Sequence, residues 1–310
     1  MILSARRNKG LVIYALFITA SHAVVASTHG GPVAVPDIPA YLSVAQWTSG
    51  GVLPENLQFH PGYGLLLSPF GALVGDNLHY AALLVNAALA GCAVFLAARV
   101  AEHIGASNVV KWLVVMVATI QPGLAASSRI AWPETLLVVV ILSITILILK
   151  NKESCWRLAS FVAALSICIH PRAVMLIIAI AFISFIKGDK AVFFGGAIPG
   201  AALTALALSV TRTWPKARVS QSRGLDSYLD LAGSTLGQVL CFSAGTISLG
   251  ILGLSMGLKD SRHIRSFEPE KLARCFVALS ALGMIILGGW ALAGSDRSDT
   301  LLYSRYIDPW

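Results

Sequence analysis

Long, uninterrupted stretches of apolar side chains constrain the fold of this chain more than any other feature of its sequence. Clear examples cover residues 79–101, 191–211 and 272–294. A helix of about 20 apolar residues can cross the hydrocarbon core of a membrane, which is about 30 Å thick. Hydrophobic residues make up 56% of the chain and charged residues 12%, against about 25% charged residues in a soluble domain. The chain therefore cannot cover its surface in water, which excludes a soluble enzyme, a disordered scaffold and a secreted disulfide mini-domain.

The apolar stretches are continuous and do not alternate with polar residues, so they indicate membrane helices and not the strands of a β-barrel. Further stretches lie near residues 11–26, 109–127, 132–149, 158–170, 173–186 and 236–257. Residues 62–76 are also apolar, but they are short and contain Gly and Pro, which favours an interfacial or re-entrant segment. We expect an all-α, polytopic bundle of about nine spans, which forms a single transmembrane domain over residues 1–310.

Residues 158–186 could form one long span or two short ones that meet at His170-Pro171-Arg172. Proline breaks a helix, and an arginine at the bilayer centre costs about 2.5–3.5 kcal/mol or more. Both effects favour two short helices, with Arg172 at an outer apex between them.

Basic residues mark the cytoplasmic side of a membrane protein, and their distribution orients the first half of the chain. In that half only Arg129 falls outside, whereas the inside positions hold Arg6, Arg7, Lys9, Arg99, Lys111, Lys150, Lys152 and Arg157. In the second half the two sides carry equal numbers of basic residues, so this half does not indicate an orientation. We expect a cytoplasmic N-terminus at residues 1–10, and outer segments at 27–77, 211–233 and 296–310. Val24-Val25-Ala26 resembles a signal-peptidase site, but we favour a retained first helix.

The net charge of +8 could indicate nucleic-acid binding, but basic cytoplasmic loops explain it better, and we expect no nucleic-acid partner. The cysteines show neither a CxxC motif nor a Cys/His metal spacing, which predicts neither a disulfide framework nor a zinc site. We expect no cofactor, and the need for a divalent metal is left open.

The segment VPDIPAYLSVAQWTSGG places Asp37 ahead of a short helix that ends near Trp47. Pro39 suits the first turn of such a helix, and Gly50-Gly51 suit its end. The simpler role for Asp37 is the N-cap of this helix. The functional role is a general base just outside the membrane, which accepts a proton from a sugar hydroxyl. The two roles are compatible, because a capping carboxylate is held rigidly.

Other polar side chains near the expected outer ends of spans are candidates for substrate binding. His60 could hydrogen-bond a polar ligand or belong to a turn toward the membrane, where Tyr63 fits an interfacial aromatic residue. Arg129 could contact a phosphate that Glu134 orients, or the two could mark only the start of a helix. Arg172 has a guanidinium that matches phosphate oxygens, or it reaches lipid headgroups.

Together these elements resemble the GT-C superfamily of integral-membrane glycosyltransferases that use polyprenyl-phosphate sugars, from about residue 11 to the C-terminus. The motifs that carry the resemblance are Asp37-x-x-x-Tyr41, HPGYGLLLSP from His60, SR-x-x-W-x-E from Ser128 to Glu134, the short helices around HPRAVML, and the terminal SRYIDP. Family members usually continue with further helices beyond the last element, so the resemblance implies a short or C-terminally truncated member.

The resemblance implies an active site at the outer face, with Asp37 as the catalytic base. It implies Arg172 and Arg305 at the donor phosphate, with Tyr306 beside Arg305 as a further substrate-binding candidate. The partners would be a polyprenyl-phosphate sugar donor, a glycan, lipid or protein acceptor, and membrane lipids. One carboxylate and several cations suffice for inversion, because a phosphate leaves without being protonated. The competing interpretations are a multi-pass transporter or lipid flippase, and a catalytically inactive membrane partner.

Overall fold

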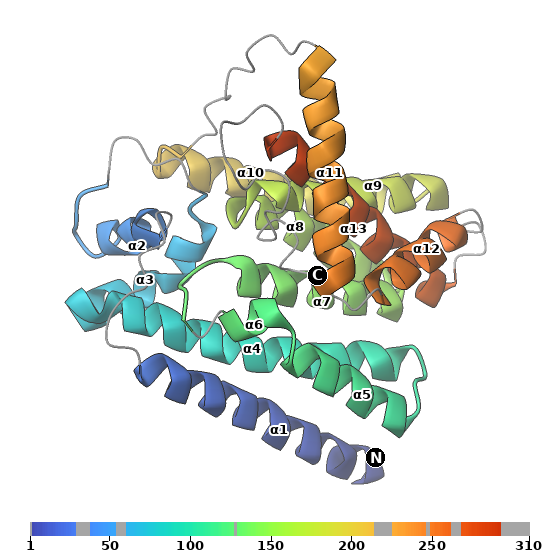
Figure 1. Cartoon of the computed structure of the whole chain (residues 1–310), viewed down its shortest axis with the longest axis horizontal. Coiled ribbons are helices and arrows are strands. Elements are labelled where there is room, and N and C mark those ends of the chain that lie inside the picture. The colour runs from blue at the N-terminus through green and yellow to red at the C-terminus, as the bar shows by residue number, and fades with distance from the viewer. Residues whose placement is uncertain are drawn as a thin grey trace. The chain divides into compact units, whose positions relative to one another are not determined.

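The computed structural model describes residues 2–28, 38–53, 60–126, 129–213, 225–245, 249–261 and 268–292. Within these ranges the chain is helical and contains no strand, so the all-α expectation is confirmed (Figure 1). The α-helices are α1 (Ile2–Ser27), α2 (Ile38–Trp47), α3 (Gly62–Val74), α4 (Leu78–His103), α5 (Asn108–Thr119), α6 (Pro122–Ala126), α7 (Glu134–Lys150), α8 (Glu153–Leu165), α9 (Val174–Lys187), α10 (Lys190–Val210), α11 (Leu225–Gly245), α12 (Leu249–Ser261) and α13 (Pro269–Leu292). The short 3-10 helices are η1 (Gly75–Asn77), η2 (Ser166–Cys168) and η3 (Pro171–Ala173).

The helices pack into two compact units, which are described separately below. Unit 1 comprises Met1–Ile146, Cys168–His170 and Ala202–Trp214. Unit 2 comprises Leu147–Ile167, Pro171–Ala201 and Pro215–Trp310.

Four helical segments of the described chain are long and apolar enough to cross a membrane: Lys9–Ser27, Leu78–His103, Lys190–Val210 and Pro269–Trp290. They identify the chain as a membrane protein. The helix α7 has 17 residues, which corresponds to about 26 Å at 1.5 Å per residue. The expected spans 158–170 and 173–186 correspond to the still shorter helices α8 and α9, and the expected span 109–127 is divided.

One long helix expected from hydropathy is divided in the structure, so this expectation was wrong in detail. The stretch 109–127 breaks after α5, because the Gln121 side-chain oxygen accepts a hydrogen bond from the backbone N–H of Leu124 at 2.7 Å. That contact, followed by Pro122 as the first residue of α6, starts a new helix. Within the stretch 236–257, the described residues up to Gly245 belong to α11 and those from Leu249 belong to α12, and residues 246–248 lie outside the described part of the chain.

The break expected between residues 158 and 186 is confirmed. The helix α8 ends at Leu165, and α9 begins only at Val174, with η2 and η3 between them. Pro171 opens η3, where the lack of a backbone N–H removes no helical hydrogen bond.

In unit 1, α1 lies along α4 (Figure 1). Leu11 and Ile18 of α1 are buried in one cluster with Val94 of α4. Gly91 allows the close approach, because a Cβ atom at this position would lie 2.1 Å from Oγ1 of Thr19. One face of the first helix therefore belongs to the unit 1 core.

Also in unit 1, α2 packs on α3, and glycines again permit the contact. A Cβ atom at Gly64 would lie 2.5 Å from the carbonyl oxygen of Tyr41, and one at Gly71 would lie 2.4 Å from that of Ala45. The helix α2 agrees with the short helix expected up to Trp47. It ends as glycine predicts, since Gly50 has φ +96° and the N–H of Gly51 donates to the carbonyl of Gln46 at 2.9 Å.

Candidate functional site

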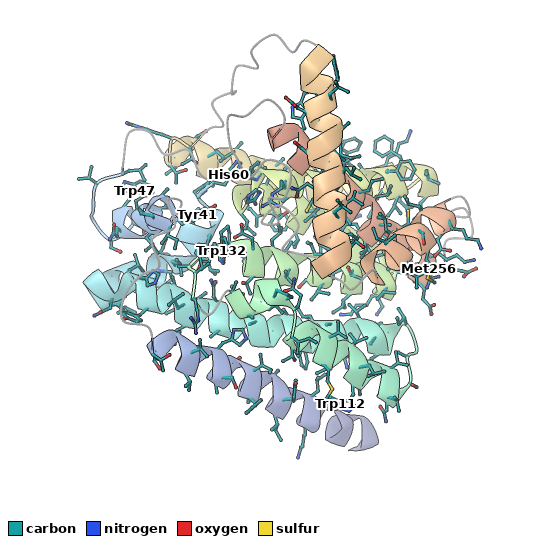
Figure 2. The ribbon with its side chains drawn as sticks, viewed as in Figure 1. Tyr41, Trp47, His60, Trp112, Trp132 and Met256 are labelled. Carbon is teal, nitrogen blue, oxygen red and sulfur yellow. The ribbon has the colours of Figure 1, made fainter. Side chains whose placement is uncertain are left out.

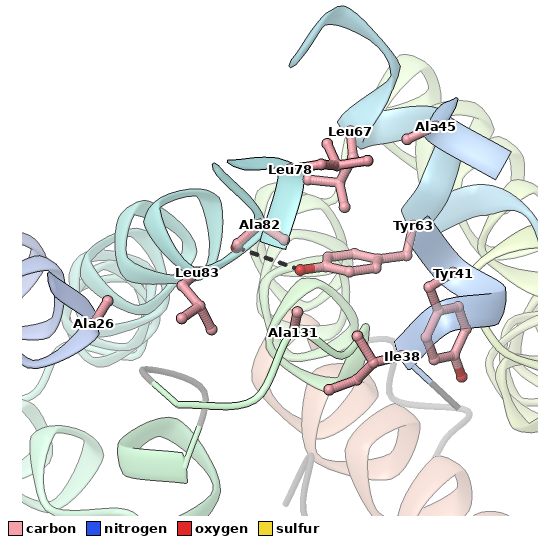
Figure 3. Close-up of a cluster of buried hydrophobic side chains, with 10 residues drawn as sticks. All are labelled: Ala26, Ile38, Tyr41, Ala45, Tyr63, Leu67, Leu78, Ala82, Leu83 and Ala131. Carbon is pink, nitrogen blue, oxygen red and sulfur yellow. Dashed lines mark hydrogen bonds between the residues drawn. The ribbon is translucent and has the colours of Figure 1, made fainter. Parts of the chain in front are cut away.

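A buried polar pair joins α3 to α4 in unit 1 and forms the centre of the candidate site. The hydroxyl of Tyr63 donates to Oδ1 of Asn86 at 2.9 Å and approaches the carbonyl oxygen of Ala82 at 3.4 Å. Both Tyr63 and Asn86 are fully buried. Figure 3 shows the Tyr63 ring between α2 and α4, with its hydroxyl directed at Ala82. The assignment of Tyr63 as an interfacial aromatic is therefore wrong, because its ring lies inside unit 1.

The amide of Asn86 fixes the segment that leads into α7. Its Nδ2 donates to the carbonyl of Ile130 at 3.1 Å and to that of Trp132 at 3.3 Å. The carbonyl of Ile130 also accepts from the backbone N–H of Trp132 at 3.1 Å, so Asn86 is a second donor to a carbonyl of this non-helical segment. By contacting these carbonyls, Asn86 ties the segment before α7 to α4 and thereby helps to position Glu134, the first residue of α7.

Tyr41, in the first turn of α2, contacts the buried pair through the ring of Tyr63. Its ring meets that of Tyr63 edge to face, with 6.0 Å between centroids and an interplanar angle of 89°, a favourable aromatic geometry. Ile38, the first residue of α2, is buried in the same cluster with Ala131 (Figure 3). The described end of the element Asp37-x-x-x-Tyr41 is therefore packed against Tyr63.

The electrostatics of the site keep the Tyr63 phenol neutral. Burial is the main cause that raises its pKa above the ordinary value of 10.0, and the nearby Glu134 carboxylate raises it further. The hydrogen bond to Asn86 opposes this shift. Tyr63 is thus a permanent hydrogen-bond donor. The effect of Glu134 on Tyr63 indicates that the Glu134 carboxylate, which is itself buried, lies near the phenol.

His60 lies at the start of α3, two residues before Gly62, and is buried (Figure 2). Gly62 sits against the segment Cys168–His170 of the same unit, where a Cβ atom would lie 2.8 Å from the backbone carbonyl of Cys168. The HPG triplet therefore works as a close-packed turn, as the simpler explanation predicts. The burial of His60 places its imidazole within the unit and not in a solvated loop.

The predicted site residues fall into three groups. His60, Arg129 and Glu134 belong to unit 1, with His60 and Glu134 buried and Arg129 exposed. Arg172 belongs to η3 of unit 2 and is buried, with 3% of its surface exposed. Asp37, Arg305 and Tyr306 lie outside the described residues, as does the proposed capping of α2 by Asp37. The structure thus brings Glu134 to the Tyr63 network.

Tyr41 and Asn86 belong to this site, although the sequence motifs give Asn86 no role. The available signal is an amide inside the apolar run of residues 79–101, because a polar side chain in a span is usually paired and functional. In the described part of the chain, no group of three or more His, Cys, Asp or Glu side chains could hold a metal ion. No known protein family, curated protein or solved structure matches the chain.

Replacing Asn86 with Leu should lower the free energy of unfolding by about 1–3 kcal/mol, since the fully buried hydroxyl of Tyr63 loses its main acceptor. The hydrogen bonds themselves account for the smaller part, about 0.6 kcal/mol each in membrane proteins. Thermal unfolding of the detergent-solubilised protein measures the effect. Cys92→Ala, on an exposed position of the same helix, is the control and should change stability by less than about 0.5 kcal/mol. If both variants are equally stable, Asn86 does not stabilise the start of α7.

Proposed function

We propose that this chain is an integral-membrane glycosyltransferase of the GT-C type, which transfers a sugar from a polyprenyl phosphate to an acceptor at the outer face. One observation carries the proposal. The helix that directly follows Asp37 is anchored by the burial of Ile38 and by the contact between Tyr41 and Tyr63. A base next to so rigid a helix would be held in place for proton transfer.

The reaction that we propose needs one carboxylate. The acceptor hydroxyl attacks C1 of the sugar and gives its proton to the Asp37 carboxylate as the new C–O bond forms. The bond between C1 and the phosphate oxygen breaks, and polyprenyl phosphate leaves with the electron pair. Cationic side chains at the donor, Arg172 and Arg305, would stabilise the charge that develops on the phosphate. Attack opposite to the leaving group inverts the configuration at C1.

Among the residues of unit 1, Tyr41 and Tyr63 would support the binding elements from behind, because both rings are buried. His60 and Glu134 have polar atoms for sugar hydroxyls, and the hydrogen bond of Tyr63 to Asn86 would keep this support rigid. Arg129, which is exposed, would contact the donor from the surface. The packing of these elements supports this arrangement because each side chain has a fixed helix behind it.

The proposed topology has nine spans, a cytoplasmic N-terminus, and outer segments at residues 29–60 and 296–310. The support is the bias of basic residues in the first half of the chain, which marks the cytoplasmic side. Single cysteines introduced at positions 37 and 300 of a cysteine-free variant should react with a membrane-impermeant thiol reagent added from outside. Reaction of position 37 only after the cytoplasmic side is opened would end the proposed mechanism.

A transfer assay with a panel of radiolabelled polyprenyl-phosphate sugars tests the activity itself. The purified chain in vesicles should release polyprenyl phosphate from one member of the panel and place its label on an acceptor. Movement of the intact sugar lipid between leaflets, without cleavage, would instead identify a flippase. No cleavage and no movement with any donor would leave an inactive membrane partner.

A further inference from the structure

Three helix ends of unit 2 meet around a buried tryptophan. The indole N–H of Trp156, in α8, donates to Oδ1 of Asn151 at 3.0 Å, and Nζ of Lys187, at the end of α9, donates to the same oxygen at 3.2 Å. Nζ of Lys187 also lies 4.4 Å from the centroid of the Trp156 ring. Asn151 has φ +49°, a left-handed conformation that asparagine tolerates better than most residues. These contacts lock the turn between α7 and α8 onto the end of α9.

The third helix end is the start of α10, which is attached through aromatic rings. Phe185 of α9 meets Phe193 and Phe194 of α10 edge to face, with centroids 5.9 and 6.0 Å apart. Nζ of Lys190 lies 5.3 Å from the centroid of the Phe185 ring, within the range of a cation–π contact. Phe185 and Phe194 remain 44% and 45% exposed, so two rings project beside the lysine.

This frame presents a basic-aromatic surface, defined here as Lys150, Lys152, Lys190, Phe185 and Phe194. All five side chains are exposed. The carboxylates on the same turns are already engaged, since Glu153 pairs with Arg157 and Asp189 pairs with Lys187. Within the described part of the chain, no ion pair neutralises the three lysines of this surface. It therefore carries a local positive charge next to exposed aromatic rings.

We propose that the basic-aromatic surface binds the headgroup of an anionic phospholipid. Exposed phenylalanine rings are apolar and suit contact with acyl chains, and nearby lysines extend to lipid phosphates at the headgroup level. The rings of Phe185 and Phe194 would lie against acyl chains while Lys150, Lys152 and Lys190 contact the phosphate. In the proposed topology this surface faces the cytoplasmic leaflet. The site belongs to unit 2 and is independent of the transfer reaction.

Lipid titration of the purified full chain in neutral detergent tests this site. Phosphatidylglycerol should raise the melting temperature and remain bound in native mass spectrometry, whereas phosphatidylcholine should do so much more weakly. A cation near an anionic lipid surface contributes about fivefold to binding. The double variant Lys152→Gln/Lys190→Gln should therefore bind phosphatidylglycerol about 30-fold more weakly. Lys152→Arg/Lys190→Arg should retain binding, because it keeps both charges.

Lys259→Gln is the matched control, since it removes an exposed lysine of the same unit on α12. It should bind phosphatidylglycerol like the original chain. Unchanged phosphatidylglycerol binding by the double glutamine variant would overturn the proposal. Equal binding of phosphatidylcholine would show that charge has no role, and equal stabilisation by soluble glycerol 3-phosphate would identify a free phosphate anion in place of a lipid. Either result would also overturn it.

Discussion

Replacing Asp37 with Asn should reduce sugar transfer by about 10²–10⁴-fold, the usual contribution of a general base. The amide keeps the volume of the side chain and an oxygen that can cap a helix, but it cannot take the proton of the acceptor hydroxyl. The amount of folded protein should stay nearly unchanged, because α2 remains anchored through Ile38 and Tyr41. Initial rates with the active donor measure the loss of transfer activity. The elution volume in size-exclusion chromatography and the melting temperature measure any loss of folded protein.

Glu55→Gln is the matched control for Asp37→Asn, because it neutralises another carboxylate of the segment 27–77. It should retain most of the transfer activity. Near-normal turnover in Asp37→Asn would leave Asp37 with a capping role only, and the transferase would need a different base. A loss of folded protein in step with the loss of activity would likewise assign Asp37 a structural role.

Replacing Arg172 with Lys should weaken use of the donor by about ten- to a hundredfold, although the charge is kept. A guanidinium contacts two phosphate oxygens at once, and an ammonium cannot reproduce that planar geometry. Loss of a charged hydrogen bond costs about 1.5–3 kcal/mol. Arg172 is 3% exposed and η3 packs against α9 and α13 within unit 2, which argues against contact of Arg172 with lipid headgroups.

Donor titrations of Arg172→Lys and Arg305→Lys measure this effect directly, and both should raise the donor concentration needed for half-maximal rate. Arg157→Lys is the control, since Arg157 is an exposed arginine of unit 2 whose contact to Glu153 a lysine can keep. It should leave donor dependence unaltered. Wild-type donor dependence in both test variants would show that these arginines do not hold the phosphate.

Local features of the sequence predicted most of the helices. The run 79–101 became α4 and the run 191–211 became α10, because apolar length alone decides whether a helix can span. The break at Pro171 was also predictable from the sequence, because a proline interrupts a helix locally, whatever its tertiary surroundings. The end of α2 at Trp47 followed from the conformational freedom of Gly50.

Features that depend on two distant segments were decided by tertiary packing. Hydropathy treats Tyr63 as an interfacial residue, yet the ring is buried because glycines of α3 bring α2 within contact distance and Asn86 accepts its hydroxyl proton. Asn86 is 23 residues from Tyr63 and 44 residues from Ile130 in the sequence. No local pattern encodes such a pairing, because a buried polar group selects its partners from whatever the folded helices place within reach.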